Sequence, residues 1–228
     1  MTEVWLIRHG ETVWNAEGRF QGQLDVPLSP KGVGQAFRVA ERIRATSMKF
    51  DALYSSDLAR SKETARPISQ AVGLEARFDT RIREIDAGDL QGLLRPEIEA
   101  RFPGFFSAVN RDPWTTKRPG GESMADVAAR MRDFLVSLPE GRMLVVTHGG
   151  VVRAGLKLLL GLEGQAWRRF HIQNTSITRL VIEAREPVLE GHAITVGDVA
   201  HLEAWADWLS DEEVSFRQFP SPPGRGPG

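Results

Sequence analysis

The 228-residue sequence contains no cysteine and no excess of positive charge. A chain without cysteine has no disulfide, no thiolate nucleophile and no cysteine-ligated metal, a composition that suits a reducing compartment. The formal net charge is -1, so the sequence lacks the basic surplus that drives tight binding to nucleic acid or anionic lipid. Neither nucleic acid nor a membrane is therefore expected as a partner.

Long apolar runs and internal linkers are also missing. A membrane-spanning helix needs about 20 apolar residues, and the best candidate, 151–162, is interrupted by Arg153 and Lys157. The first residues lack the basic-then-apolar pattern of a signal peptide, so we expect a cytoplasmic protein. No composition change divides the interior, which predicts one domain over residues 1–212. The Pro- and Gly-rich residues 213–228 are expected to form a flexible tail because they have little to bury.

Short apolar runs that are bounded by polar or glycine residues alternate with helical patterns. Such runs are typical of parallel strands covered on both faces, and their shortness favours strand over buried helix. The expected strands are 4–7, 52–55, 143–146, 177–182 and 192–196. This order predicts an α/β fold, a three-layer sandwich with a mostly parallel central sheet and helices on both faces.

Helices are predicted between these strands. The clearest one covers 122–138, where apolar residues recur at spacings of three and four residues. Ser123 and Asp126 at its start resemble a capping box. A helix that opens at Pro30 is expected to carry Val33, Phe37, Ala40 and the stem of Arg44 together on its inward face. Further helices are expected after Ser56 or Asp57, either of which is a suitable N-cap, and over 151–160.

Residues 93–121 fit neither pattern, because prolines and glycines interrupt short helical pieces that carry several aromatic side chains. We expect an insertion beside the functional crevice. Two interpretations stay open at this point. The aromatics form an apolar wall that selects the organic part of a substrate, or they only bury the insertion against the body of the protein.

Phosphate-seeking side chains follow three of the predicted strands. Arg8 and His9 come directly after the first strand, Arg60 follows the second, and His148 follows the strand at 143–146. In an open parallel α/β sheet, the loops that leave the carboxyl ends of the strands meet in one crevice. The sequence therefore predicts a pocket in which two histidines and two arginines surround one phosphoryl group.

Each of these side chains suits one part of phosphoryl transfer. A neutral imidazole can attack phosphorus, so His9 is the candidate nucleophile and would form a phosphohistidine. Arg8 and Arg60 carry permanent charge on a fork of donors that matches phosphate oxygens. His148 precedes Gly149 at a helix start, where it can donate to the same group.

Two further residues complete the predicted chemistry. Asn15 can donate to the phosphoryl group, and Glu84 is the candidate acid that protonates the leaving oxygen and then activates water. A metal between the two histidines is disfavoured, because two arginines would repel a cation and a carboxylate-rich shell is missing. The sequence also lacks a phosphate-binding P-loop and a complete dinucleotide fingerprint, so these competing motifs are discarded.

At these residues the sequence resembles the histidine phosphatase superfamily, which also contains cofactor-dependent phosphoglycerate mutases. The matching segments are Arg8-His9-Gly10-Glu11-Thr12 with Asn15, Arg19-Phe20-Gln21-Gly22, Ser55-Ser56-Asp57-Leu58-Ala59-Arg60 and Thr147-His148-Gly149-Gly150. The resemblance implies that His9 is phosphorylated, that Glu84 is the proton donor, and that no metal or organic cofactor takes part. It also implies a set of substrate-binding residues: Arg8, Asn15, Gln21, Gly22, Arg60, Glu84, His148 and Gly149.

The sequence departs from the mutases in three places. Ile85 stands where they carry an arginine that grips a second anionic group, Gly150 stands where they tend to carry asparagine, and the 93–121 insertion is short. These departures favour a phosphatase that acts on a small phosphorylated metabolite. A mutase stays an alternative because Lys117 and Arg118 can supply anion binding from another part of the chain. A noncatalytic module that binds a phosphorylated ligand is a third hypothesis. The organic part of the substrate and a homodimeric state are left open.

Overall fold

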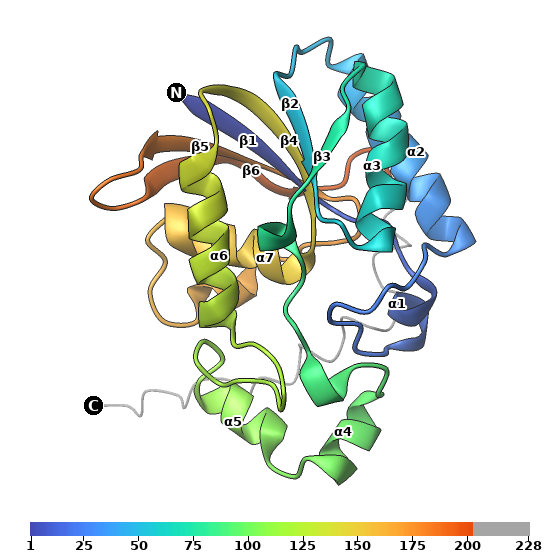
Figure 1. Ribbon diagram of the computed structural model, residues 1–228, viewed down its shortest axis with the longest axis vertical. Helices are drawn as coiled ribbons and strands as arrows, with labels where there is room; N and C mark the ends of the chain where they lie inside the picture. The colour runs from blue at the N-terminus through green and yellow to red at the C-terminus, as the bar shows by residue number, and fades with distance from the viewer. Residues whose placement is uncertain (203–228) are drawn as a thin grey trace, which may run out of the picture.

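A six-stranded sheet forms the centre of the computed structural model, which describes residues 1–202 (Figure 1). The strands lie in the order β3-β2-β4-β1-β5-β6, in which the first four are parallel and β5 pairs antiparallel with both β1 and β6. Their bounds are β1 Thr2–Arg8, β2 Ala52–Ser55, β3 Ala76–Phe78, β4 Gly141–Thr147, β5 Ile177–Ala184 and β6 Glu190–Asp198. The mostly parallel sheet that the sequence predicts is confirmed, and β3 is a short strand that it did not predict.

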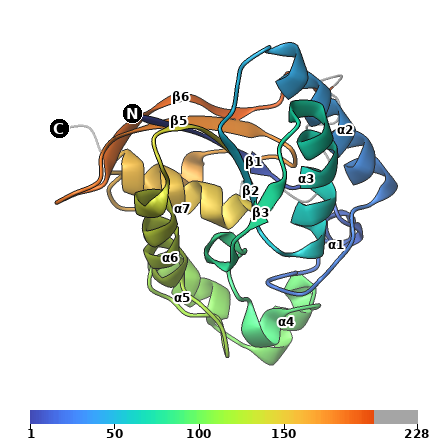
Figure 2. The same ribbon diagram turned by 45° about the horizontal axis from the view of Figure 1, so that its top comes forward.

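Helices cover both faces of this sheet. Figure 2 shows α2 and α3 on one side and α6 and α7 on the other. The helix bounds are α1 Val13–Glu17, α2 Pro30–Ala45, α3 Ala59–Val72, α4 Arg95–Arg101, α5 Phe105–Arg111, α6 Met124–Ser137 and α7 Gly149–Leu159. The capping box predicted at Ser123 and Asp126 is present at the start of α6. Within residues 1–202 no helix is both long and apolar enough to cross a bilayer.

The core consists of two apolar layers separated by the sheet. Side chains alternate along a strand, so in β1 Val4 and Leu6 join the layer under α6 and α7, while Trp5 and Ile7 join the layer under α2 and α3. All four are buried. This two-sided burial explains why the strand segments read as continuous apolar runs.

The buried face of α2 differs from the predicted one. Val33 and Phe37 are 43% and 57% exposed, so their predicted burial is wrong. The face that packs inward carries Gly32, Gln35, Ala36, Val39, Ala40 and Ile43. Gly32 packs against the loop after β1, where a Cβ would come within 1.9 Å of the Glu11 carbonyl oxygen, and Val39, Ala40 and Ile43 join the apolar layer.

The start of α3 also differs from the prediction. The helix begins at Ala59 with Leu58 at the N-cap, whose own side chain makes no cap hydrogen bond, and Asp25 Oδ1 accepts from Ala59 N at 2.8 Å. Ser56 Oγ accepts from the N-cap amide of Leu58 at 3.3 Å and also contacts His148, while Asp57 forms an ion pair with Arg83.

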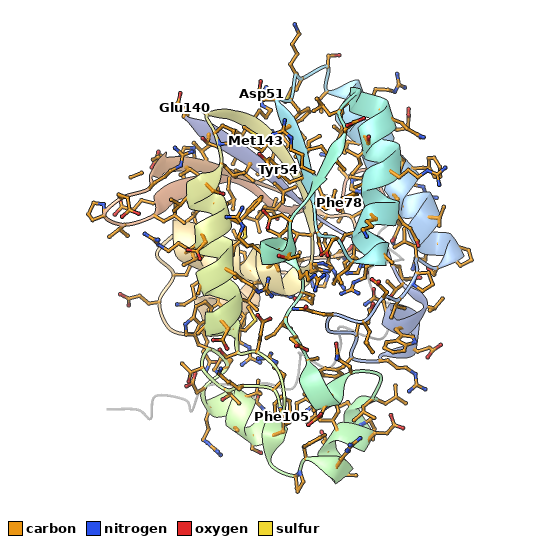
Figure 3. The ribbon with its side chains drawn as sticks, in the orientation of Figure 1. Asp51, Tyr54, Phe78, Phe105, Glu140 and Met143 are labelled. Atoms are coloured by element: carbon orange, nitrogen blue, oxygen red, sulfur yellow. The ribbon has the colours of Figure 1, made fainter. Side chains whose placement is uncertain are left out.

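The insertion forms a separate lobe that carries α4 and α5. In Figure 3, Phe105 lies in this lobe at one end of the molecule, while Asp51 and Glu140 lie at the opposite end, where β2 and β4 begin. The lobe has a small core of its own, made of Ala87, Leu90 and Ile98 with Phe20, Leu93, Phe102, Phe105 and Phe106 packed around it. These phenylalanines therefore bury the insertion, which favours the second of the two interpretations. The predicted tail, 213–228, lies outside the described residues, as do residues 203–212.

Candidate active site

The carboxyl ends of three adjacent strands bring the predicted site residues together. β4 lies between β1 and β2, with Arg8 opposite Thr147 and Ser55 opposite Val146. The hydrogen bonding continues one residue past the strands, from His9 N to Thr147 O and from Ser56 N to Val146 O, both at 2.9 Å. As a result, the rings of His9 and His148 lie with their centroids 5.1 Å apart.

The environment of His9 sets the tautomer and the charge of its ring. Its Nδ1 lies 2.7 Å from the carbonyl oxygen of Gly10, and a carbonyl only accepts, so Nδ1 carries the proton and Nε2 keeps the lone pair. Burial, and then the charges of Arg60 and Arg8, lower the pKa of His9 well below its usual 6.5. The ring is therefore neutral at physiological pH, as an attack on phosphorus requires.

The loop that carries His9 is packed against α2 and α3. A Cβ on Gly10 would come within 2.5 Å of the Gly32 carbonyl oxygen, so glycine is needed at this position for the contact with α2. The amide of Gly10 donates to Thr64 Oγ1 at 2.9 Å, and the Thr64 hydroxyl donates to the Arg60 carbonyl at 2.7 Å. These contacts connect the loop of His9 to the helix that supplies Arg60.

Arg60 is held almost completely inside the protein, 1% exposed. Its Nη1 and Nη2 donate to the carbonyls of Leu24 and Gly22 at 2.9 and 2.7 Å, and its buried Nε has no partner among the described residues. Burial lowers the pKa of Arg60 to about 10, which leaves the side chain charged at neutral pH. Arg8 reaches the site from β1, and its Nη1 donates to the Ile172 carbonyl at 2.7 Å.

His148 is the second ring of the pair and is fully buried. Burial, followed by the charges of Arg60 and His9, lowers its pKa well below 6.5. Its Nε2 lies 2.9 Å from Ser56 Oγ and 3.3 Å from Ser61 Oγ, while Nδ1 has no partner within residues 1–202. Buried polar atoms are normally satisfied, so the unpartnered Arg60 Nε and His148 Nδ1 indicate a site for a group rich in acceptors.

Glu84 lies against the first turn of α7. Its Oε1 accepts from Ile85 N at 2.9 Å and its Oε2 accepts from Gly150 N at 3.2 Å. Its backbone carbonyl is held by Gln23 Nε2 at 3.1 Å and by Arg130 Nη2 at 3.0 Å. Gly150 is two residues after His148 in the sequence, in the first turn of α7. The carboxyl group is therefore fixed at the helix end that favours negative charge.

The remaining predicted residues take more specific positions. The Oδ1 of Asn15 accepts from Thr12 N in the capping box of α1, which leaves its amide nitrogen as the donor. Gln21 places a buried Oε1 with no partner in the described part of the chain. Gly22 gives its carbonyl to Arg60, so it holds an arginine, and Gly149 is the first residue of α7, next to Arg8.

Sequence reasoning missed several residues that hold the site. Ser56 and Ser61 contact His148, and Gln23 and Arg130 contact the backbone of Glu84. Ser56 follows a strand in the same way as His9 and His148, and that position was the available signal. No local pattern in the sequence singles out Arg130, which comes from the middle of α6. Among the described residues no group of three or more histidine, aspartate or glutamate side chains could hold a metal ion.

Comparisons with known proteins identify the family of the chain. The model of the histidine phosphatase superfamily (branch 1) matches residues 4–195. A relative from Salmonella choleraesuis named "Probable phosphoglycerate mutase GpmB" is 40% identical over 209 residues, which cover 90% of this chain and 96% of that protein.

Two solved structures are similar over most of their length. The mycobacterial glucosyl-3-phosphoglycerate phosphatase is 33% identical with a TM-score of 0.76, over 86% of this chain and 99% of that one. A variant of phosphoserine phosphatase from Entamoeba histolytica, in complex with phosphoserine, is 29% identical with a TM-score of 0.74, over 89% and 100%. On the family match, the shared fold and the relatives, the chain belongs to the histidine phosphatase superfamily.

Proposed function

We propose that the protein is a metal-independent phosphatase that hydrolyses small phosphomonoesters, with His9 as nucleophile and Glu84 as general acid and base. The observation that carries the proposal is the pairing of His9 and His148, 5.1 Å apart, beside the unpartnered Nε of the buried Arg60. Membership of a superfamily of phosphatases and mutases supports an enzyme of phosphoryl transfer.

The first step transfers the phosphoryl group to the enzyme. The lone pair on His9 Nε2 attacks phosphorus, the N–P bond forms, and the bond to the leaving oxygen breaks while Glu84 gives that oxygen a proton. Arg8, Arg60 and His148 stabilise the charge on the equatorial oxygens. The neutral state of His148 suits this role, because a neutral imidazole still carries one N–H group that can donate a hydrogen bond.

The second step releases phosphate. Glu84, now a carboxylate, takes a proton from water, the resulting oxygen attacks phosphorus, and the N–P bond breaks to return neutral His9. Ile85 supports hydrolysis over mutase chemistry, because its aliphatic side chain offers no charge to hold a second anionic group beside Glu84.

The test is hydrolysis of p-nitrophenyl phosphate in excess chelator. We expect turnover by the wild type and none above background by His9→Ala, and rapid acid-free quenching with labelled substrate should trap an alkali-stable phosphoryl group on the wild type alone. Undiminished turnover by His9→Ala would contradict the nucleophile assignment.

The second candidate is a phosphoglycerate mutase, which the name of the Salmonella relative favours. It predicts that interconversion of 2- and 3-phosphoglycerate, dependent on 2,3-bisphosphoglycerate, is much faster than hydrolysis. Measuring both rates on the same preparation decides between the two activities.

A further inference from the structure

Residues 173–176 form the turn that leads into β5 (Figure 1), and this turn is bonded to the end of β1. Arg8 N donates to Ser176 O at 3.2 Å, and Thr175 N donates to Arg8 O at 2.9 Å and to His9 O at 3.3 Å. The paired residues of β1 and β5 end at Ile7 and Ile177. The turn therefore extends the contact between these strands as far as His9, the proposed nucleophile.

Thr175 is held in a backbone conformation that threonine rarely adopts. Its φ is +58°, in the left-handed region that usually takes glycine or asparagine, and the residue is fully buried. The Thr175 hydroxyl donates to Asn174 O at 2.7 Å and lies 3.1 Å from His201 Nε2. A strained residue persists only where its surroundings hold it, and such residues are concentrated at functional sites. The turn is thus fixed in one conformation beside His9.

The side chain of Asn174 contacts two residues of the site. Its Nδ2 donates to His9 O at 3.0 Å and lies 3.5 Å from Asn15 Oδ1. A side-chain amide nitrogen carries two hydrogens, so the one group can serve both acceptors. Asn174 therefore connects the backbone of the proposed nucleophile with the side chain of Asn15, which the sequence predicts to bind the phosphoryl group.

The same contacts determine which way the Asn15 amide faces. Thr12 N and the Thr12 hydroxyl both donate to Asn15 Oδ1, each at 3.1 Å. A backbone N–H group only donates, so the atom that faces Thr12 and Asn174 is the amide oxygen. With this oxygen held from two sides, the nitrogen of the Asn15 amide is directed elsewhere and is available to an acceptor such as a phosphoryl oxygen.

We propose that Asn174 is a positioning residue of the active site, which holds the Asn15 amide beside His9 so that both meet the same phosphoryl group. The proposal rests on the phosphatase function proposed above and adds a residue to the same site. Asn174 acts through Asn15 and through the backbone of His9. A misplacement of about 1 Å in such a site can cost about 100-fold in rate, so a bridge of this kind has a measurable effect.

The experiment measures the inhibition constant of orthovanadate against hydrolysis of p-nitrophenyl phosphate. Vanadate bound with five oxygens imitates the transition state of phosphoryl transfer, so its affinity reports the alignment of the groups around phosphorus. An inhibition constant does not depend on the fraction of enzyme that is folded. A substitution that only destabilises the protein therefore leaves the constant unchanged.

Three single variants are compared with the wild type. Asn174→Ala should raise the inhibition constant by about 10-fold, as expected when a hydrogen bond to a charged group is weakened. Asn174→Asp has the same shape and should raise it at least as much, because a carboxylate cannot donate to the two acceptors. The matched control is Gln173→Ala, whose side chain contacts His171 at the exposed surface, and it should stay within about twofold of the wild type. Equal constants for Asn174→Ala and the wild type would overturn the proposal.

A double-mutant cycle with Asn15 tests the bridge itself. In an Asn15→Ala background, the added Asn174→Ala should raise the inhibition constant by less than about threefold, because the group that Asn174 positions is already gone. A rise of about 10-fold in that background as well would show that the two residues act independently, and the proposed bridge would then be wrong.

Failure of the phosphatase function is distinguishable from failure of this inference. Should the wild type hydrolyse no phosphomonoester, the proposed function fails, and calorimetric titration with inorganic phosphate replaces the kinetic assay. A higher Kd for Asn174→Ala than for the wild type then supports the positioning role. Equal Kd values, or a wild type that does not bind phosphate, overturn it.

Discussion

Gly150 determines where the carboxyl group of Glu84 can lie. Its amide donates to Glu84 Oε2 at 3.2 Å, and a Cβ built on Gly150 would collide with Oε1 of the same carboxyl group. The missing side chain at position 150 and the placement of the proposed acid are therefore a single feature of the site. A residue with a side chain there forces Glu84 into another position.

Gly150→Ala should move Glu84 out of place and lower kcat/KM. General acid catalysis contributes about 10²- to 10⁴-fold, and we expect a loss of at least about 10-fold with an alkyl phosphate such as glycerol 3-phosphate. The loss should be smaller with p-nitrophenyl phosphate, because p-nitrophenolate leaves without the help of an acid. Steady-state kinetics with the two substrates measure this difference.

The matched control is Gly34→Ala on α2, where no atom lies within 4 Å of the added Cβ. Alanine in an exposed helix position is neutral or slightly stabilising, so this variant should keep wild-type kinetics. Equal losses with both substrates in Gly150→Ala would argue that the substitution disturbs the pocket in general and leaves the role of Glu84 unsupported.

Single residues were predictable when the strand itself places them. His9 and His148 follow parallel strands directly, so the topology alone brings them to one edge of the sheet. Ser56 and Asp57 follow β2 in the same way, yet the sequence suggested a helix cap for them, because serine and aspartate are common caps. Their actual partners, His148 and Arg83, come from distant parts of the chain, and local sequence carries no information on such contacts.

At the scale of elements, α6 shows how a capping box sets the start of a helix. Ser123 Oγ accepts from Asp126 N at 3.2 Å, and Ser123 N donates to Asp126 Oδ2 at 2.9 Å. Ser123→Ala should lower the free energy of unfolding by about 1 kcal/mol. Ser137→Ala at the exposed end of the same helix should change it by less than about 0.5 kcal/mol. Urea unfolding of both variants checks the prediction, and similar values for the two would contradict it.

The insertion contains the helices α4 and α5 and has its own apolar cluster, in which Ile98 is fully buried. Ile98→Ala removes buried methyl and methylene groups, and such changes cost about 2–5 kcal/mol in well-packed cores. Because the cluster is separate from the two layers around the sheet, we expect the amides of α4 and α5 to exchange faster while those of β1 and β4 keep their protection. Hydrogen exchange resolves the two regions, and equal acceleration in both would show that the insertion unfolds together with the main core.

Helices differ in how much of their packing the sequence reveals. The apolar repeat of α6 has one face and a capping box, so its position and its buried side were both predictable. In α2 the residues that pack inward include glycine, alanine and glutamine, whereas the large apolar Val33 and Phe37 point outward. The exposed Val33 and Phe37 have the same four-residue spacing as the buried Val39 and Ile43, so hydrophobic periodicity alone does not distinguish the two faces.

At the scale of the whole molecule, the order of the strands positions the site. β1, β2 and β4 are parallel neighbours, so their carboxyl ends open into one crevice, and this much follows from the pattern of short apolar runs. The antiparallel pairing of β5 with β1 and with β6 does not follow from it, because neither composition nor periodicity encodes strand direction. The same holds for Asn174, which reaches His9 because the start of the antiparallel β5 lies beside the end of β1.

Burial of three histidines makes the stability of the fold depend on pH. The pKa values of His9 and His148 are lowered well below 6.5, first by burial, and burial lowers the pKa of His201 to about 4. In the unfolded chain each ring takes up a proton as the pH falls through about 6.5. In the folded protein the same rings stay neutral until the pH is lower. Protonation thus favours the unfolded state, and stability is lost as the pH falls below 6.5.

The free energy of unfolding should therefore be highest above pH 7 and should fall toward pH 5, by up to about 1.4 kcal/mol per pH unit for each buried ring. Carboxylates contribute little in this window, because most of them ionise below about pH 4.5 in the unfolded chain. Urea unfolding at pH 7.5, 6.5 and 5.5 in phosphate-free buffer measures the slope, since bound phosphate would stabilise the folded state by itself. His201→Gln removes one of the three rings and should reduce the slope by about a third. A free energy of unfolding that stays constant from pH 7.5 to 5.5 would mean that these rings are protonated in the folded protein, and it would remove the neutral imidazole on which the nucleophilic role of His9 depends.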